Sequence, residues 1–450
     1  MDGVNRTKDG VDSVGGVAGV GGAALRSRDS MRLGALRSHN TALVLDLLRT
    51  AGPEGISRLE LAERTGLTPQ AVSKITARLR EDGLAAEAGH RASTGGKPRT
   101  VLRLVPEAGH AVGVHLDRDE LTAVLCDLTG AVVARRRAPL DLGAGAETVV
   151  ERAVRAVGEL TADAARTAGA TEVTGAADGT GAVDRAGAIG GARAADEAGV
   201  TDEAGVAGGG PRPGAVLGVG VALPGPLDHR RGVLHRVTGF PEWNGFPLRD
   251  VLARRLSLPV VVDKDTNAAA LGLAVGGETA SGTSFAYLHF GAGVGGGLVI
   301  GGAVHRGART GAGEFGHQVV QLDGPPCECG NRGCVEALCL AAVARGDLAE
   351  AARVLGTAVG NLVALLDVDL VLLGGRTVAA APDTFVRGVT AVLHERARRA
   401  GEDAVPVRVA SGGGAGGGAG AGGGGARAER GVAEGAAQLL LAPLFGRAEG

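Results

Sequence analysis

Residues 314–336 read EFGHQVVQLDGPPCECGNRGCVE, and they are the most informative stretch of the chain. Three cysteines lie on one short loop, with a histidine just upstream. Three thiolates and one imidazole form a closed tetrahedral zinc site. A closed set leaves no position for a reacting water, so we predict structural zinc held by His317, Cys327, Cys329 and Cys334. The alternative is a redox-active or accidental cysteine cluster, which the intervening glycines disfavour because they free the backbone to wrap an ion.

The composition sets outer limits on the function. With 450 residues the chain has room for two or three domains. Its formal net charge of −2 excludes a general nucleic-acid coat, so any DNA contact must be local. No apolar run of membrane-spanning length and no apolar secretory segment occur, and three of the five cysteines are clustered. We therefore expect a cytoplasmic protein without a membrane partner, in which Cys126 and Cys339 are core thiols.

Composition shifts divide the chain. With 80 glycines and only 2% aromatic residues, part of it must be of low complexity. We expect a disordered tail over 1–33, with translation starting at Met31 as a hypothesis, and flexible insertions over 163–213 and 411–428. Two folded domains remain, 34–105 and 107–446. In the second, predicted strands alternate with predicted helices, which indicates an α/β core.

The first domain has the pattern of a winged helix-turn-helix. Leu59 to Arg64 is predicted to form a short helix, Thr65 to Leu67 a turn, and Thr68 the cap of a second helix that starts at Pro69. Residues 36–105 hold eleven Lys and Arg against seven Asp and Glu, so this domain is basic although the chain is not. The side chains expected at DNA, from the second helix and from the wing of a following hairpin, are Thr68, Gln70, Ser73, Lys74, Arg78, Lys97 and Arg99. The alternative is a helical module for protein contacts, with an ordinary solvated basic face.

These motifs together resemble the ROK family of bacterial sugar-responsive repressors and sugar kinases. The resemblance rests on the segment 314–336, on Leu223-Pro-Gly-Pro226 and on the DKDTNAA stretch from Asp263 to Ala269. It implies an α/β two-lobed actin-like (ribonuclease H-like ATPase) sugar kinase fold, with the sugar in the cleft between the lobes. It further implies that Asp265 matches the catalytic base of the kinases. Glu314, His317 and Glu336 match residues that contact the sugar.

The residue types support a sugar site independently. Sugar hydroxyls need carboxylates and amides as partners, which Asp265, Asn267, Glu314 and Glu336 supply. The alternative is that Asp265 and Asn267 only cap the helix that starts near Ala268. Lys264 stands where the family usually has an asparagine facing the sugar. A lysine there favours an anionic ligand such as a sugar phosphate, or simply points to solvent.

The phosphate-binding pattern of the kinases is lost. Their Asp-x-Gly-Gly-Thr loop corresponds here to His115-Leu-Asp-Arg-Asp-Glu120, in which both glycines and the threonine are missing. Three carboxylates stand where the nucleotide phosphates would lie and oppose them. A second glycine loop, 291–297, survives, but Ala292 replaces the expected hydroxyl residue. The stretch from Glu336 to Leu355 is shorter than in relatives, which predicts a missing helical segment in the larger lobe.

We therefore predict a DNA-binding transcriptional repressor of carbohydrate metabolism rather than an enzyme. Its expected partners are double-stranded operator DNA, a sugar or sugar-phosphate effector, and its own copy in a homodimer or a dimer of dimers. The alternative is an ATP-dependent, glucokinase-like sugar kinase that retains a DNA-binding head and uses Asp265 as its base. A third alternative is a constitutive DNA-binding protein whose operator binding does not respond to any sugar.

Overall fold

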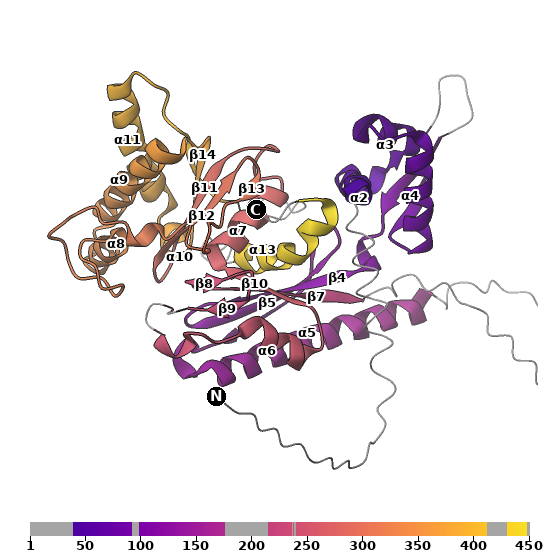
Figure 1. The fold of residues 1–450 in the computed structure, drawn as a ribbon, viewed down its shortest axis with the longest axis horizontal. Coiled ribbons are helices and arrows are strands. Elements are labelled where there is room, and N and C mark those ends of the chain that lie inside the picture. Colours follow the sequence, from indigo (N-terminus) through magenta and orange to yellow (C-terminus); the bar gives the residue numbers. More distant parts are fainter. Residues whose placement is uncertain are drawn as a thin grey trace, which may run out of the picture.

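The computed structural model describes the backbone of residues 39–91, 99–175, 215–235, 237, 240–411 and 430–447. The predicted tail, Lys97 at the wing tip and most of the two predicted insertions lie outside these described residues. Figure 1 shows a small N-terminal domain beside a larger body built around two sheets.

The N-terminal domain is a winged helix-turn-helix, as predicted. Ser57 and Glu60 form a capping box at the start of the first helix of the motif, and Gly66 ends that helix in the left-handed conformation. Thr68 caps the next helix through the Ala71 amide, with Pro69 in its first turn. A three-stranded sheet in the order β1-β3-β2 completes the domain. Its elements are α2 (His39–Ala51), η1 (Gly52–Glu54), β1 (Ile56–Ser57), α3 (Arg58–Thr65), α4 (Pro69–Glu81), β2 (Ala85–Arg91), β3 (Arg99–Leu104) and η2 (Pro106–Ala108).

The first lobe of the body is a five-stranded sheet in the order β10-β7-β4-β5-β6, covered on one face by α5 and α6 (Figure 1). Apolar residues alternating along the strands bury this face, and Trp243 is fully buried within the cluster. The backbone of α5 runs to Gly175, well past residue 163, where the sequence predicted an insertion to begin. The elements are β4 (His110–Leu116), β5 (Glu120–Asp127), β6 (Val132–Pro139), η3 (Leu142–Ala144), α5 (Ala146–Gly175), β7 (Val216–Leu223), β8 (Leu227–Asp228), β9 (Val233–Leu234), η4 (Pro241–Trp243), α6 (Leu248–Leu256) and β10 (Val260–Lys264).

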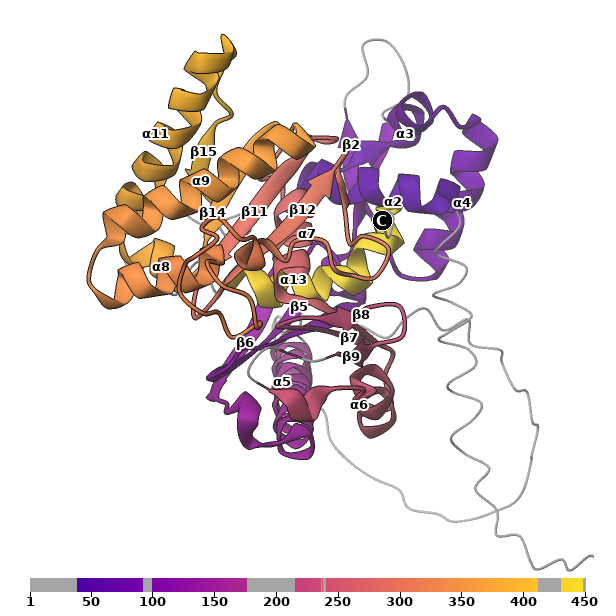
Figure 2. The same cartoon turned by 60° about the vertical axis from the view of Figure 1, so that its left-hand side comes forward.

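The second lobe is a five-stranded sheet in the order β13-β12-β11-β14-β15. The helix α7 lies on one face, while α8, α9 and α11 lie on the other (Figure 2). The two lobes thus form the predicted two-lobed sugar kinase fold. The elements are α7 (Asp265–Val275), β11 (Phe285–Phe290), β12 (Val294–Ile300), β13 (Ala303–Val304), η5 (Phe315–His317), α8 (Val335–Ala344), α9 (Leu348–Leu366), β14 (Leu370–Gly374), α10 (Arg376–Ala380), α11 (Pro382–Ala400) and β15 (Val407–Val409).

The short stretch after Glu336 forms an ordered helical pair. The helices α8 and α9 are joined by a three-residue turn, and Asp347 caps α9 by accepting a hydrogen bond from the Glu350 amide at 2.9 Å. By length and composition α9 is the one helix of the described chain that could cross a membrane. Half of its apolar window is buried, and it packs against α8 and α11 as a core helix does.

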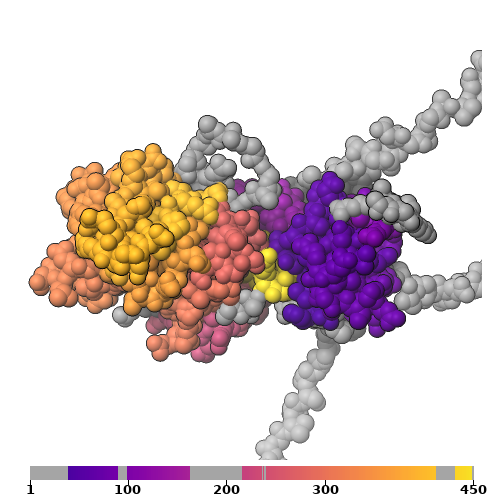
Figure 3. Space-filling view, turned by 90° about the horizontal axis from the view of Figure 1, so that it is seen from above, coloured from indigo at the N-terminus to yellow at the C-terminus, as the bar shows by residue number. Residues whose placement is uncertain are grey.

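The C-terminal helix α13 (Arg430–Leu441), continued by η6 (Ala442–Phe445), lies at the centre of the molecule. It is packed between the open face of the first sheet and α7, and it extends to α2 of the N-terminal domain. One hydrophobic cluster accordingly joins residues of α2, α3 and α4 to residues of β4, β5 and α13. Figure 3 shows the yellow C-terminal segment at the junction between the indigo N-terminal domain and the body. The sequence pattern did not single out this helix.

Candidate functional sites

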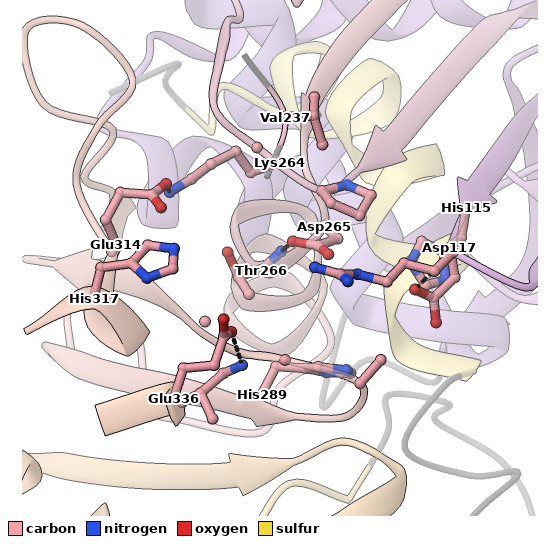
Figure 4. Close-up of a pocket in the computed structure, with 18 residues that line it drawn as sticks. His115, Asp117, Val237, Lys264, Asp265, Thr266, His289, Glu314, His317 and Glu336 are labelled. Carbon is pink, nitrogen blue, oxygen red and sulfur yellow. Dashed lines mark hydrogen bonds and ion pairs between the residues drawn. The ribbon is translucent and has the colours of Figure 1, made fainter. Parts of the chain in front are cut away.

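A cavity of about 110 Å³ lies between the two lobes. Its walls come from the β4–β5 turn, the loop after β7, the start of α7, the β11–β12 turn, the segment before η5, and α8. Figure 4 shows Glu314, His317 and Glu336 on one side, His115 and Asp117 on the opposite side, and Asp265 between them. The predicted sugar residues Lys264, Asp265, Glu314, His317 and Glu336 therefore line a single cavity.

Asp265 faces this cavity from the first turn of α7. One of its carboxylate oxygens accepts a hydrogen bond from the Thr266 amide at 2.6 Å. The residue at the N-cap position is Lys264, and it forms no side-chain capping bond. The alternative was that Asp265 and Asn267 only cap a helix that starts near Ala268. The helix instead begins three residues earlier, at Asp265, so both residues lie within its first turn rather than before it.

Asn267 does not reach the cavity, which corrects its prediction as a ligand-binding residue. It is fully buried, and its side-chain amide donates to Asp263 at 2.9 Å. The other Asp263 oxygen accepts from Arg306 at 2.7 Å, in an ion pair whose two side chains are both buried. Asn267 therefore stabilises the wall behind the cavity. No sequence motif pointed to Arg306, since its partner lies 43 residues away in the chain.

The two glutamates hold neighbouring segments in place. Glu336 is buried, and it accepts a hydrogen bond from the Val294 amide at 2.7 Å, which ties α8 to the start of β12. Glu314 is half-exposed and pairs with Lys264 at 2.9 Å. Lys264 is itself buried, so the alternative in which it points to solvent is wrong.

His289 contributes a neutral polar group to the cavity. Burial lowers the pKa of its imidazole, and its Nδ1 lies 3.1 Å from the hydroxyl of Tyr287. Neighbouring Asp265 and Asp117 oppose this shift only in part. The sequence pattern did not identify His289, because a histidine in an apolar strand is more often a core residue.

The turn that the sequence predicts to correspond to the kinase phosphate loop is acidic. The β4–β5 turn places Asp117, Asp119 and Glu120 with His115 around a second cavity, of about 130 Å³. Asp119 crosses to the other lobe, where it pairs with Arg376 at 3.0 Å. The groups that surround this position are therefore mostly carboxylates, which repel phosphate.

The second glycine loop is largely a strand. Only 291–293 form a turn, and β12 begins at Val294. A Cβ atom at Gly297 would lie 2.1 Å from the Thr266 carbonyl oxygen, so glycine is required there to let α7 approach the sheet. This packing explains Gly297 without any bound phosphate.

The predicted metal ligands converge. One ligand atom from each of His317, Cys327, Cys329 and Cys334 lies within 4.8 Å of all the others. The Cys329 and Cys334 sulfurs are 3.7 Å apart, and Cys327 Sγ lies 3.7 Å from His317 Nδ1. A tetrahedral ion with Zn–S bonds of about 2.3 Å requires sulfurs about 3.8 Å apart, so the donor set fits zinc. The other two cysteines are buried in the core, as predicted.

The candidate DNA-binding surface is the exposed face of α4. Thr68, Gln70, Ser73, Lys74 and Arg78 are all exposed, as is Arg99 at the start of β3. Two basic residues of this helix have acidic neighbours: Arg78 lies 3.8 Å from Asp82, and Arg80 pairs with Glu87 at 3.0 Å. Lys74 has no ion-pair partner among the described residues, which makes it the cation of this helix most available to DNA.

A winged helix-turn-helix domain joined to a two-lobed sugar kinase fold defines the architectural class of this chain. Residues 210–344 match the ROK family, and residues 53–85 match the winged helix-turn-helix DNA-binding family. The chain therefore contains a ROK family domain and, before it, an N-terminal winged helix-turn-helix domain.

The chain is similar both to transcriptional repressors and to sugar kinases. The xylose repressor of Caldicellulosiruptor bescii is 25% identical over 281 residues, which cover 62% of this chain and 59% of that repressor. The glucokinase of Thermotoga maritima is 40% identical over 133 residues, covering 29% of this chain and 42% of the kinase. The alignments thus span about three fifths of that repressor and less than half of the kinase.

The fold likeness covers more of the chain. The crystal structure of a ROK family transcriptional regulator, described as a homologue of the Escherichia coli MLC protein, aligns with a TM-score of 0.60 at 19% identity. The alignment covers 91% of this chain and 100% of that one. At 19% identity, this structural similarity supports the fold alone, namely an N-terminal domain followed by two lobes.

Proposed function

We propose that this chain is a cytoplasmic DNA-binding transcriptional repressor of carbohydrate metabolism, controlled by a sugar or sugar derivative bound between its lobes. The observation that carries the proposal is the shared hydrophobic cluster, in which the helices of the DNA-binding domain pack with β4, β5 and α13 of the body. A change in the lobes can therefore move the α4 surface without a flexible linker absorbing it.

The sugar site in this proposal uses Asp265, Glu314, His317 and Glu336 as hydroxyl partners. Zinc held by His317, Cys327, Cys329 and Cys334 would fix the loop between Glu314 and Glu336, which both line the cavity. Bound zinc supplies a rigid cross-link and no reacting water, because four protein ligands fill its coordination.

The regulatory step is a population shift. A sugar that contacts both lobes favours the closed arrangement over the open one. The gain in free energy equals the difference between its binding free energies for the closed and open arrangements. The α7 helix carries Asp265 at the cavity and packs along α13, and η6 at the end of α13 packs on α2. Arg49 of α2 lies 5.1 Å from the centre of the Phe445 ring, and Arg447 lies 3.6 Å from Asp46. In a homodimer this movement would change the spacing of the two α4 helices on a pseudo-palindromic operator.

Replacing Lys74 by alanine tests the DNA-binding part of the proposal. If Lys74 reads a base edge, operator affinity should fall by about 1 to 3 kcal/mol, with a smaller loss on scrambled DNA. The measurement is fluorescence anisotropy of the upstream DNA of the gene, at stated salt, with and without a panel of sugars. Arg387→Ala, on the exposed face of α11, removes one positive charge far from α4 and serves as the control.

Three outcomes are informative. An equal loss on both DNAs would make Lys74 a phosphate contact. Unchanged affinity for both would remove α4 as the recognition surface. Specific binding that no sugar relieves would favour a constitutive DNA binder over a sensor.

The sugar kinase remains the second candidate, because the 40% identical relative is a glucokinase and Asp265 faces the cavity. We expect no sugar-dependent ADP release, since Asp117, Asp119 and Glu120 surround the position that phosphates would need. The assay is coupled ADP detection with a hexose panel. Turnover that disappears in Asp265→Asn would replace the repressor proposal with the kinase.

A further inference from the structure

Lys264 is the most deeply buried charged group at the sugar cavity. Its side chain is 3% exposed, and its ammonium donates to the Ala312 carbonyl oxygen at 2.6 Å and to Glu314 at 2.9 Å. Gly225 lies against its aliphatic stem, since a Cβ atom at Gly225 would come within 2.7 Å of the lysine Cδ. Figure 4 shows the side chain directed at Glu314. Lys264 therefore joins the start of α7 to the segment that precedes η5.

The charge of Lys264 is already compensated. One of its acceptors is a carboxylate, and a buried ammonium is stable only when it is paired in this way. The cavity is also lined by Asp117, Asp265 and Glu336, with Arg118 as the other cation among the described lining residues. Carboxylates thus outnumber cations in the lining, and a phosphate ester would add negative charge beside them.

Lys264 binds one carboxylate oxygen of Glu314, so the other oxygen can accept a hydrogen bond from a ligand. Oε1 is held by the ammonium, while the side chain remains 39% exposed. A glutamate that is already held in one rotamer loses less side-chain entropy when it binds a hydroxyl than a flexible glutamate would. We propose that Lys264 is a positioning residue that holds Glu314 as a fixed acceptor for a hydroxyl of an uncharged sugar, and that it is not a receptor for phosphate. This inference rests on the proposed sugar-sensing function.

The test is a double-mutant cycle read by calorimetric binding to the full chain. The probes are xylose, glucose and N-acetylglucosamine, together with the phosphate monoesters of the last two. Lys264→Met keeps the apolar stem and removes the charge, whereas Glu314→Gln keeps the shape and removes the partner. We expect each change to weaken binding of the neutral sugar about tenfold or more, and the double variant to bind no more weakly than Glu314→Gln alone. Wild-type protein should prefer the neutral member of each pair.

Controls separate this role from a purely structural one. Arg353→Met removes a comparable charge from an exposed ion pair on α9 and should leave sugar binding unchanged. Lys264→Gln retains one donor, and it should recover part of the affinity lost in Lys264→Met. The preference of wild-type protein for the neutral sugar needs no variant, so it tests the inference even where the Lys264 variants do not fold.

Two results would overturn the inference while leaving sugar sensing intact. The first is a phosphate ester that binds wild-type protein more tightly than its parent sugar and loses this advantage in Lys264→Met. The second is a double variant in which the two losses multiply, since independent contacts would then replace positioning. Absence of binding by every neutral and phosphorylated probe would instead reject the sugar-sensing function itself.

Discussion

Gly113→Ala is expected to destabilise the body by at least about 3 kcal/mol, because the new methyl group would collide with a helix backbone. A Cβ atom at Gly113 of β4 would lie 1.9 Å from the Ala433 carbonyl oxygen and 2.7 Å from the Ala437 amide nitrogen. Neither atom can rotate away as the end of a side chain could. On the opposite face of α13, a Cβ at Gly435 would lie 1.9 Å from the Ala268 carbonyl oxygen of α7. The helix is therefore confined from both sides.

The measurement is the midpoint of urea unfolding, followed by circular dichroism. Gly158→Ala is the matched control, because Gly158 lies on the exposed face of α5, where an added Cβ atom would meet no other atom within 4 Å. That control should raise stability by up to about 1 kcal/mol, the ordinary gain of alanine over glycine in a helix. Equal stability of Gly113→Ala and wild type would show that α13 does not pack on β4. A folded Gly113→Ala protein should also lose the sugar response of its DNA binding.

Cys334→Ala is expected to abolish both metal binding and sugar binding. Cys334 is fully buried at the start of α8, two residues before Glu336, and its sulfur lies 3.7 Å from that of Cys329. Without it the loop that joins Glu314 to Glu336 loses its cross-link, so both carboxylates lose their positions at the cavity. Metal analysis of chelator-washed protein should give about one zinc per chain for the wild type and almost none for the variant.

Cys339→Ala provides the control within the same helix. Cys339 is equally buried, and its thiol contacts the Ala351 carbonyl oxygen rather than the cluster. This change should leave zinc content at about one ion per chain. If Cys334→Ala retained its zinc, the three other ligands would suffice and the closed tetrahedral site would be wrong. If zinc were lost but sugar affinity stayed normal, the metal would not position the cavity.

The local elements were predictable because their signals lie within a few residues. Thr68 and Pro69 specify the start of α4, since a cap and its helix are consecutive in the chain. The candidate metal ligands were predictable for a similar reason. The eight residues from Cys327 to Cys334 form one short loop, which can close on an ion wherever it lies in the fold. The alternation of strands with helices in the second domain was predictable for the same reason, because apolar periodicity is a local property of the chain.

The connections between the domains were not predictable in this way. The importance of α13 comes from contacts with β4, β7 and α7, and its short Gly- and Ala-rich sequence carries no sign of them. Lys264 meets Glu314 across 50 residues of chain, and Asn267 proved to face Asp263 rather than the cavity.

A residue pattern specifies which face of a helix is apolar and which side chains can cap or ligate nearby. The pairing of two buried charges depends on where distant segments come together. In this chain the winged helix-turn-helix and the convergence of His317 with the three clustered cysteines followed from sequence. The roles of Lys264, Asn267 and α13 followed from packing, because hydrogen bonds and close backbone contacts between distant segments exist only once both lobes have folded around the same helix.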